Sequence, residues 1–238
     1  MTATRTPIHL DTADMILPIV FLLGFYSGVS IEVTATIPFP AAPAGIAGMV
    51  MLWRRREDMT QIQVTALIVV LLLYLASIFC ATDLDFLKKR FTGFLQLSYS
   101  LIIAYAFFLT LLRADRGQLA KLFLGFCLVI LLGSFLEEHT GLRNLSDAVR
   151  AHLYPGADIY DSDLRDRLIY GRIRPKLFTS EPSAVTFAYT TFAFAWLMTS
   201  RWRWRTLGYL ALFAVGVVIL PGPTLLLMLI LGIPYQLL

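Results

Sequence analysis

Long apolar runs dominate this chain and restrict what it can fold into. They recur along the sequence, and several approach the roughly 20 residues with which a helix crosses a bilayer. The chain is 58% hydrophobic and 15% charged, whereas soluble domains are about 45–50% apolar and about 25% charged. The runs also lack the strict alternation of membrane β-strands. We therefore expect an all-α, polytopic transmembrane helical bundle.

The apolar runs predict seven or eight spans in a single membrane domain that covers 1–238. The expected spans are 15–33, 41–53, 62–80, 91–112, 119–136, 182–199, 207–220 and a last run over 224–238. Pro221-Gly222-Pro223 breaks the chain between the last two runs. The polar stretch 137–181 is a large loop between the fifth and sixth spans.

The large loop is expected to carry two short amphipathic helices at the membrane surface. Asn144 or Ser146 could cap the first, and the second should start near Asp163 and end near Tyr170. Bare basic clusters such as 54–56 and 201–205 fall on the other side of the membrane and predict a cytoplasmic N-terminus. The loop is then extracytoplasmic. The net charge of +4 reflects this loop topology and does not indicate nucleic-acid binding.

A dense group of charges directly precedes the sixth span. Arg172, Arg174 and Lys176 come first, and Glu181 then stands at the head of the apolar run. Ionisable groups at membrane depth are costly, which makes them candidates for function. Arginine forks and lysine suit a phosphate or pyrophosphate on a lipid carrier. The alternative is a basic patch that contacts lipid headgroups.

Pro182 fits the first turn of a helix, where its missing N–H costs nothing. Glu181 then falls at or just before the N-cap, where the helix dipole favours a carboxylate. Such a carboxylate could accept bonds from free backbone N–H groups or orient an arginine. It could also act as the base for an incoming hydroxyl.

The segment 174–183 resembles the motif of the O-antigen polymerase/O-antigen ligase superfamily of bacterial envelopes. Arg174 is followed seven residues later by Glu181-Pro182-Ser183, as an arginine of the large periplasmic loop is in that family. The long loop after about five spans also fits, as does the break at 221–223, where the family often has a Ser-rich turn. Leu177 departs from the pattern, because the family usually has glycine there.

The resemblance implies a GT-C-like fold and metal-independent, inverting glycosyl transfer at the periplasmic face of the bacterial inner membrane. The donor is a glycan on undecaprenyl pyrophosphate, and no cofactor is needed. Arg172 and Arg174 are the expected contacts of the leaving group, and Glu181 orients them or acts as the base. Lys176 and Ser183 are expected to contact substrate. Membrane lipids and other polysaccharide-assembly membrane proteins are the expected partners.

A second basic cluster, which includes Lys89 and Arg90, directly precedes the fourth span. It is expected to help bind the pyrophosphate. The alternative is contact with lipid headgroups, and Asp83 or Asp85 could also pair with these cations.

The sequence 137–139, Glu-Glu-His, closes the fifth span and is expected to be a solvated helix end. Three such residues in a row cannot all face one ion on a helix, so no metal site is expected here.

A polysaccharide polymerase is the leading interpretation, and three alternatives stay open. The first is the related ligase, which transfers to a lipid A core or a protein. The second is a transporter or flippase of lipid-linked sugars, which should show charged or broken helices at mid-membrane. The third is an inactive fragment, because the chain stops inside an apolar run and the family usually carries further spans. We therefore expect a C-terminal truncation relative to that family.

Overall fold

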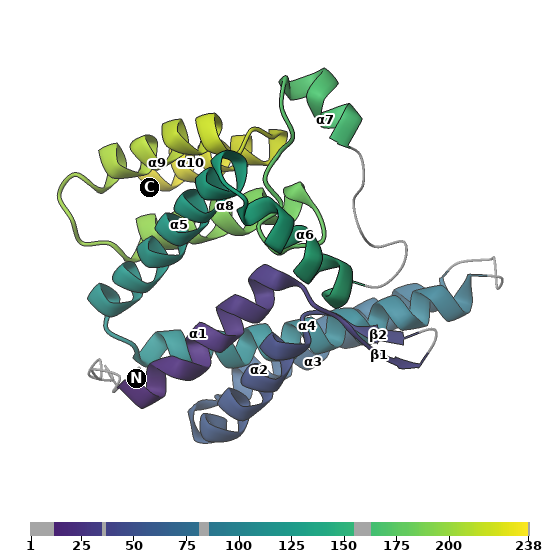
Figure 1. Ribbon diagram of the computed structural model, residues 1–238. Coiled ribbons are helices and arrows are strands. Elements are labelled where there is room, and N and C mark those ends of the chain that lie inside the picture. The colour runs from purple at the N-terminus through teal and green to yellow at the C-terminus, as the bar shows by residue number, and fades with distance from the viewer. Residues whose placement is uncertain (1–11, 35–36, 81–85, 155–162, 238) are drawn as a thin grey trace. The chain divides into compact units, whose positions relative to one another are not determined.

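The structure, a computed structural model, describes residues 12–34, 37–80, 86–154 and 163–237. Apart from one antiparallel pair of short strands, β1 (Ile31–Thr34) and β2 (Ile37–Phe39), the regular elements of these residues are helices. The helices in the predicted spans are α1 (Thr12–Ser27), α2 (Ala42–Arg54), α3 (Gln61–Phe79), α4 (Leu87–Arg113), α5 (Arg116–His139), α8 (Pro182–Thr199), α9 (Arg205–Ile219) and α10 (Leu226–Leu237) (Figure 1). The large loop contains α6 (Leu142–Leu153) and α7 (Asp163–Tyr170), and the 3₁₀ turns are η1 (Arg56–Asp58) and η3 (Pro223–Leu225).

Several helix boundaries differ from the prediction by a few residues, among them the end of α1 and the end of α5. α1 ends at Ser27, not near residue 33, because Gly28 adopts a φ of 63° and the chain then enters β1. α5 continues through His139, so the Glu-Glu-His sequence forms its last turn and not the start of a loop.

Three helices in the described part of the chain, α3, α4 and α5, are long and apolar enough to cross a membrane. α1, α9 and the η3–α10 segment are also apolar but shorter. These helices indicate a membrane-associated, helical protein.

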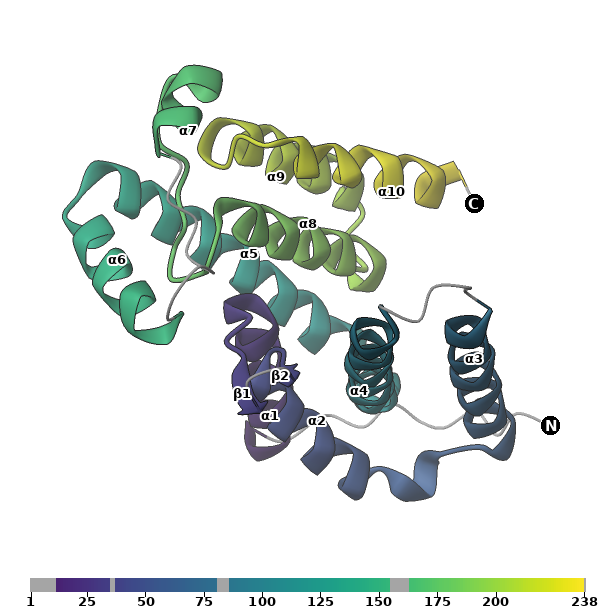
Figure 2. The ribbon, with the colours of Figure 1, turned by 90° about the vertical axis from the view of Figure 1, so that its right-hand side faces the viewer.

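The chain divides into two compact units, and the first contains Met1–Phe25 and Val29–Arg113. Small residues of α2 allow close helix packing in this unit. A Cβ on Gly48 would lie 2.7 Å from the Ile103 Cβ on α4, and one on Gly24 of α1 would lie 2.2 Å from the Ala44 backbone nitrogen. α3 lies beside α4 (Figure 2) and is almost entirely exposed, with Ile78 as its buried residue.

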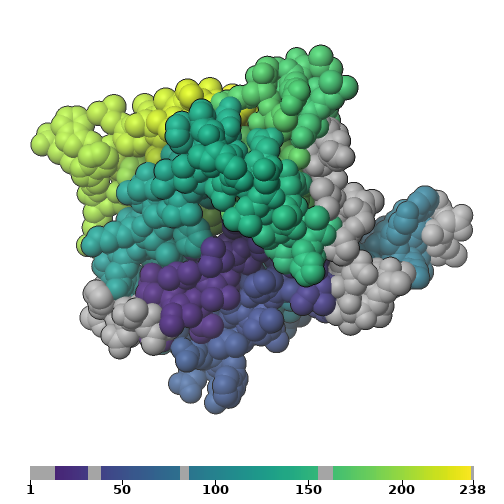
Figure 3. All heavy atoms as spheres, in the orientation of Figure 1, coloured from purple at the N-terminus to yellow at the C-terminus, as the bar shows by residue number. Residues whose placement is uncertain are grey.

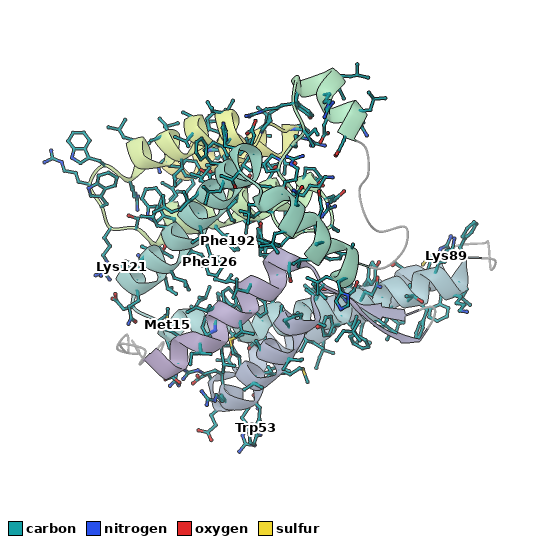
Figure 4. The ribbon with its side chains drawn as sticks, in the orientation of Figure 1. Met15, Trp53, Lys89, Lys121, Phe126 and Phe192 are labelled. Carbon is teal, nitrogen blue, oxygen red and sulfur yellow. The ribbon has the colours of Figure 1, made fainter. Side chains whose placement is uncertain are left out.

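The second unit contains Tyr26–Gly28 and Ala114–Leu238. α8 is its central helix and packs against α5, α9 and α10. Phe126 and Phe192 meet between α5 and α8 with ring centroids 5.0 Å apart (Figure 4). The Tyr189 hydroxyl donates to the Leu212 carbonyl oxygen at 2.7 Å, which satisfies a buried polar group between α8 and α9.

α6 lies at the surface of its unit (Figure 3) and confirms the predicted first loop helix. The expected caps are wrong, because Gly141 occupies the N-cap without a side-chain bond and Ser146 is buried inside the helix. Leu145 is 56% exposed, whereas Arg150 is 2% exposed. The helix therefore turns Ser146 and Arg150 towards its own unit and leaves Leu145 outwards.

Candidate anion-binding site

Residues 172–181, called the strap here, connect α7 to α8. Two consecutive residues of the strap, Leu177 and Phe178, have φ angles of 33° and 65°. This left-handed region is unfavourable for residues with a Cβ, by roughly 1–2 kcal/mol each. The surrounding side chains must therefore hold the strap in place.

Glu137 is the first of these side chains. Its carboxylate is 1% exposed and accepts the backbone N–H groups of Lys176 at 3.1 Å and Leu177 at 2.5 Å. The expectation of a solvated helix end is wrong for Glu137, because the strap covers this last turn of α5. Hydrogen bonds to a charged acceptor are among the stronger ones in proteins.

Two side chains of α6 form three further hydrogen bonds with the strap. The buried Arg150 donates from Nε to the Thr179 carbonyl at 2.6 Å and from Nη2 to the Ser180 carbonyl at 2.9 Å. Asp147 pairs with the same guanidinium at 2.6 Å. The Ser146 Oγ accepts the Phe178 N–H at 2.9 Å. The polar side of α6 thus serves to fix the strap backbone.

Two tyrosines complete the support. The Tyr154 hydroxyl lies 3.1 Å from the Phe178 carbonyl oxygen and also contacts the Ser27 carbonyl. The Tyr26 hydroxyl donates to the Leu177 carbonyl at 2.7 Å. Burial raises the pKa of the Tyr154 phenol to about 12, against the opposing effect of Arg150. The Tyr154 hydroxyl is therefore a protonated donor at neutral pH.

The three strap cations each have an acidic partner. Arg172 Nη1 lies 2.8 Å from both carboxylate oxygens of Glu138, and its Nη2 contacts the Val218 carbonyl. Arg174 pairs with the fully buried Asp166 at 2.9 Å, and Lys176 pairs with Asp163 at 3.0 Å.

Arg174 is 12% exposed and lies between two segments that are distant in sequence. Its guanidinium stacks on the Tyr170 ring of α7, 4.8 Å from the ring centroid. A Cβ on Gly222 would lie 3.9 Å from Arg174 Nη1 and 3.7 Å from Thr186 Oγ1. The turn at 221–223, which follows α9, therefore lies beside Arg174 and the first turns of α8.

A pocket of about 490 Å³ opens next to Arg172. Its lining residues come from the end of α5, the start of α6, α7 and the strap: Glu138, Arg143, Arg167, Gly171, Arg172 and Ile173. The lining thus contains three arginines and one carboxylate, and the volume is in the range of small-ligand sites. Arg143 Nη2 also donates to the Ile173 carbonyl at 3.3 Å, which fixes this arginine against the strap. The excess of basic side chains in its lining makes the pocket a candidate anion site.

Glu181 is the N-cap residue of α8, as expected, and it is exposed. Its carboxylate caps no backbone N–H, and within the described residues it pairs with no arginine. The orienting of Arg172 and Arg174 therefore falls to Glu138 and Asp166. Ser183 is half-buried in the first turn of α8.

Lys89 and Arg90 belong to the first unit, where they line a separate pocket. Their expected role in binding the donor pyrophosphate stays a prediction. Asp83 and Asp85, the suggested partners of these cations, lie outside the described residues.

The sequence pointed to Arg172, Arg174, Lys176, Glu181 and Ser183, but not to the roles of Arg143, Arg167 and Asp166. The last three lie in the polar loop without a distinguishing motif. The burial of Asp166 has no signal in the sequence, because the helix pattern would bury the leucines of α7, whereas Leu164 and Leu168 are 73% and 78% exposed.

Within the described ranges, no group of three or more His, Cys, Asp or Glu side chains is placed to hold a metal ion. Comparisons of the chain with protein-family models, curated proteins and solved structures found no match.

Proposed function

We propose that this protein is a bacterial polysaccharide polymerase. It transfers a glycan from undecaprenyl pyrophosphate to a hydroxyl of another lipid-linked repeat unit at the periplasmic face of the inner membrane. The observation that carries this proposal is the three-arginine pocket beside Arg172, at the end of an apolar helix that is long enough to span a membrane.

The pocket suits a pyrophosphate leaving group. Arg143, Arg167 and Arg172 can bind its oxygens through charge-assisted hydrogen bonds and stabilise the charge that develops as it departs. Glu138 keeps Arg172 in one orientation, so little reorganisation is needed during the reaction. In this proposal, Arg174 holds the strap beside α7 and the turn at 221–223. Lys176 holds the strap through its ion pair with Asp163.

The transfer step requires a base, and Glu181 is the candidate. The acceptor oxygen attacks the anomeric carbon of the donor while the bond between that carbon and the pyrophosphate oxygen breaks. The leaving pyrophosphate takes the bonding electron pair, and the acceptor proton passes to the Glu181 carboxylate. Glu181 is exposed and has no ion-pair partner within the described residues, so its carboxylate is available for this role.

Two local features further support the resemblance to the O-antigen polymerase/ligase superfamily. Leu177 occupies the position of the family's usual glycine, and its φ of 33° lies in the region that favours glycine. The 221–223 break, where the family often has a polar turn, lies beside Arg174.

In this proposal the apolar helices form seven or eight spans of a GT-C-like bundle with a cytoplasmic N-terminus. α6 and α7 then lie on the periplasmic membrane surface, which suits the outward apolar residues of α6. Partners are the lipid-linked donor, membrane lipids and other polysaccharide-assembly membrane proteins.

The test is chain extension by purified protein supplied with undecaprenyl-pyrophosphate-linked repeat units. We expect a ladder of longer glycans from the wild type, none from Arg172→Ala and poor rescue by Arg172→Lys, because a point charge does not replace a bidentate fork. Arg165→Ala is the matched control, since Arg165 is exposed on α7 but does not line the pocket. A full ladder from Arg172→Ala would refute the assignment, and transfer of a single unit to a lipid A core would favour the ligase.

A further inference from the structure

A second pocket, of about 550 Å³, lies in the first unit between the end of α3 and the start of α4. It is lined by Tyr74, Ser77, Ile78, Phe86, Lys89, Arg90 and Gly93. Figure 4 shows Lys89 near the start of α4. The pocket therefore combines two cations with an aromatic and aliphatic wall.

The two cations are available to a ligand. Within the described ranges, neither Lys89 nor Arg90 forms an ion pair. The Lys89 Nζ lies 5.7 Å from the Phe86 ring centroid, which keeps the ammonium at the pocket rim. A Cβ on Gly93 would have no neighbour within 4 Å. The face of α4 at Gly93, one turn after Arg90, is therefore open.

The surroundings of the pocket are strongly apolar. α3 is long and apolar enough to cross a membrane, and most of its side chains are exposed. Tyr74 and Phe86, two of the lining residues, are 39% and 50% exposed. A ligand that fits both the cations and these helix faces must carry an anionic head and long apolar chains.

We propose that this pocket binds the phosphate headgroup of an anionic phospholipid, with its acyl chains along α3 and α4. Arg90, half-buried and at the start of the apolar part of α4, is the main phosphate ligand, and Lys89 adds a second charge from the rim. Tyr74 packs against the glycerol region, since its ring is amphipathic and lines the wall. This proposal replaces the donor pyrophosphate, which the sequence suggested as the ligand of Lys89 and Arg90, and it does not rest on the proposed glycosyl transfer.

The test measures the binding of phosphatidylglycerol to the purified full chain by native mass spectrometry, against phosphatidylcholine as the neutral lipid. Lys89→Gln and Arg90→Gln should each weaken binding about fivefold, the change expected for the loss of one cation beside a lipid phosphate. Lys88→Gln is the matched control, because Lys88 is an exposed cation on the same helix that does not line the pocket. It should leave binding unchanged.

Three results would overturn the proposal. Equal weakening by Lys88→Gln would show diffuse attraction to the surface, and unchanged binding in both pocket variants would show that the cations are not used. Displacement of phosphatidylglycerol by a polyprenyl pyrophosphate or by inorganic phosphate would assign the pocket to another phosphate source. Lys89 is exposed, so Lys89→Gln keeps the test valid if Arg90→Gln fails to fold.

Discussion

Glu137→Gln should loosen the strap by a measurable amount. The wild-type carboxylate accepts two backbone N–H groups, whereas a glutamine offers one oxygen and turns an N–H₂ group towards the second donor. A buried donor without a partner costs about 1–3 kcal/mol. Taking about 2 kcal/mol, the local opening that exposes the Lys176 and Leu177 amides becomes about 30-fold more populated.

Hydrogen–deuterium exchange of peptides that cover 172–181 measures this change directly. The matched control is Glu138→Gln, on the same helix turn, where a partly exposed ion pair with Arg172 is lost at a cost of about 1 kcal/mol or less. We expect about 30-fold faster exchange of the two amides in Glu137→Gln and little change at these amides in Glu138→Gln. Unchanged exchange in Glu137→Gln, or equal acceleration in both variants, would refute the role given to Glu137.

Three further outcomes follow from contacts within the two units. Gly48→Ala should lower stability by about 1–3 kcal/mol, because its Cβ would lie 2.7 Å from the Ile103 Cβ, whereas Gly125→Ala, with no neighbour within 4 Å, should not destabilise the helix; thermal unfolding in detergent compares them. Asp166→Asn should cost about 1–3 kcal/mol, because the fully buried Asp166 loses the charge with which it pairs with Arg174; thermal unfolding measures this too. The pKa of Tyr154, raised from 10.0 to about 12, predicts stability that is complete below about pH 10 and lost towards pH 12; Tyr154→Phe should lack this loss in alkaline unfolding curves.

Much of the helical organisation follows from sequence, because each apolar run is long and its ends carry strong local signals. α8 begins at Pro182 and ends at Thr199, as predicted, since proline at the first turn leaves little alternative. α1 was predicted too long because the apolar character continues through the strand beyond Gly28. Hydropathy alone does not separate a helix from a short apolar strand.

The site was predictable in part. Arg172, Arg174 and Glu181 stand out because they crowd the start of a span. The residues that hold the strap do not stand out, because their contacts are long-range. Glu137 and Leu177 are 40 positions apart in the sequence, and Arg150 and Ser180 are 30 positions apart. No local pattern specifies such pairs. The left-handed conformation of Leu177 was also hidden, since leucine is not a residue that usually adopts it.

The measurement that tests the central proposal most directly is equilibrium binding of undecaprenyl pyrophosphate to the purified protein. Arg167→Ala removes one charge-assisted contact from the pocket, so binding should weaken by about tenfold or more. Arg165→Ala, an exposed arginine of α7 outside the pocket, should bind like the wild type. Equal affinity of the wild type and Arg167→Ala, or equal weakening in both variants, would contradict the assignment of this pocket to the donor pyrophosphate.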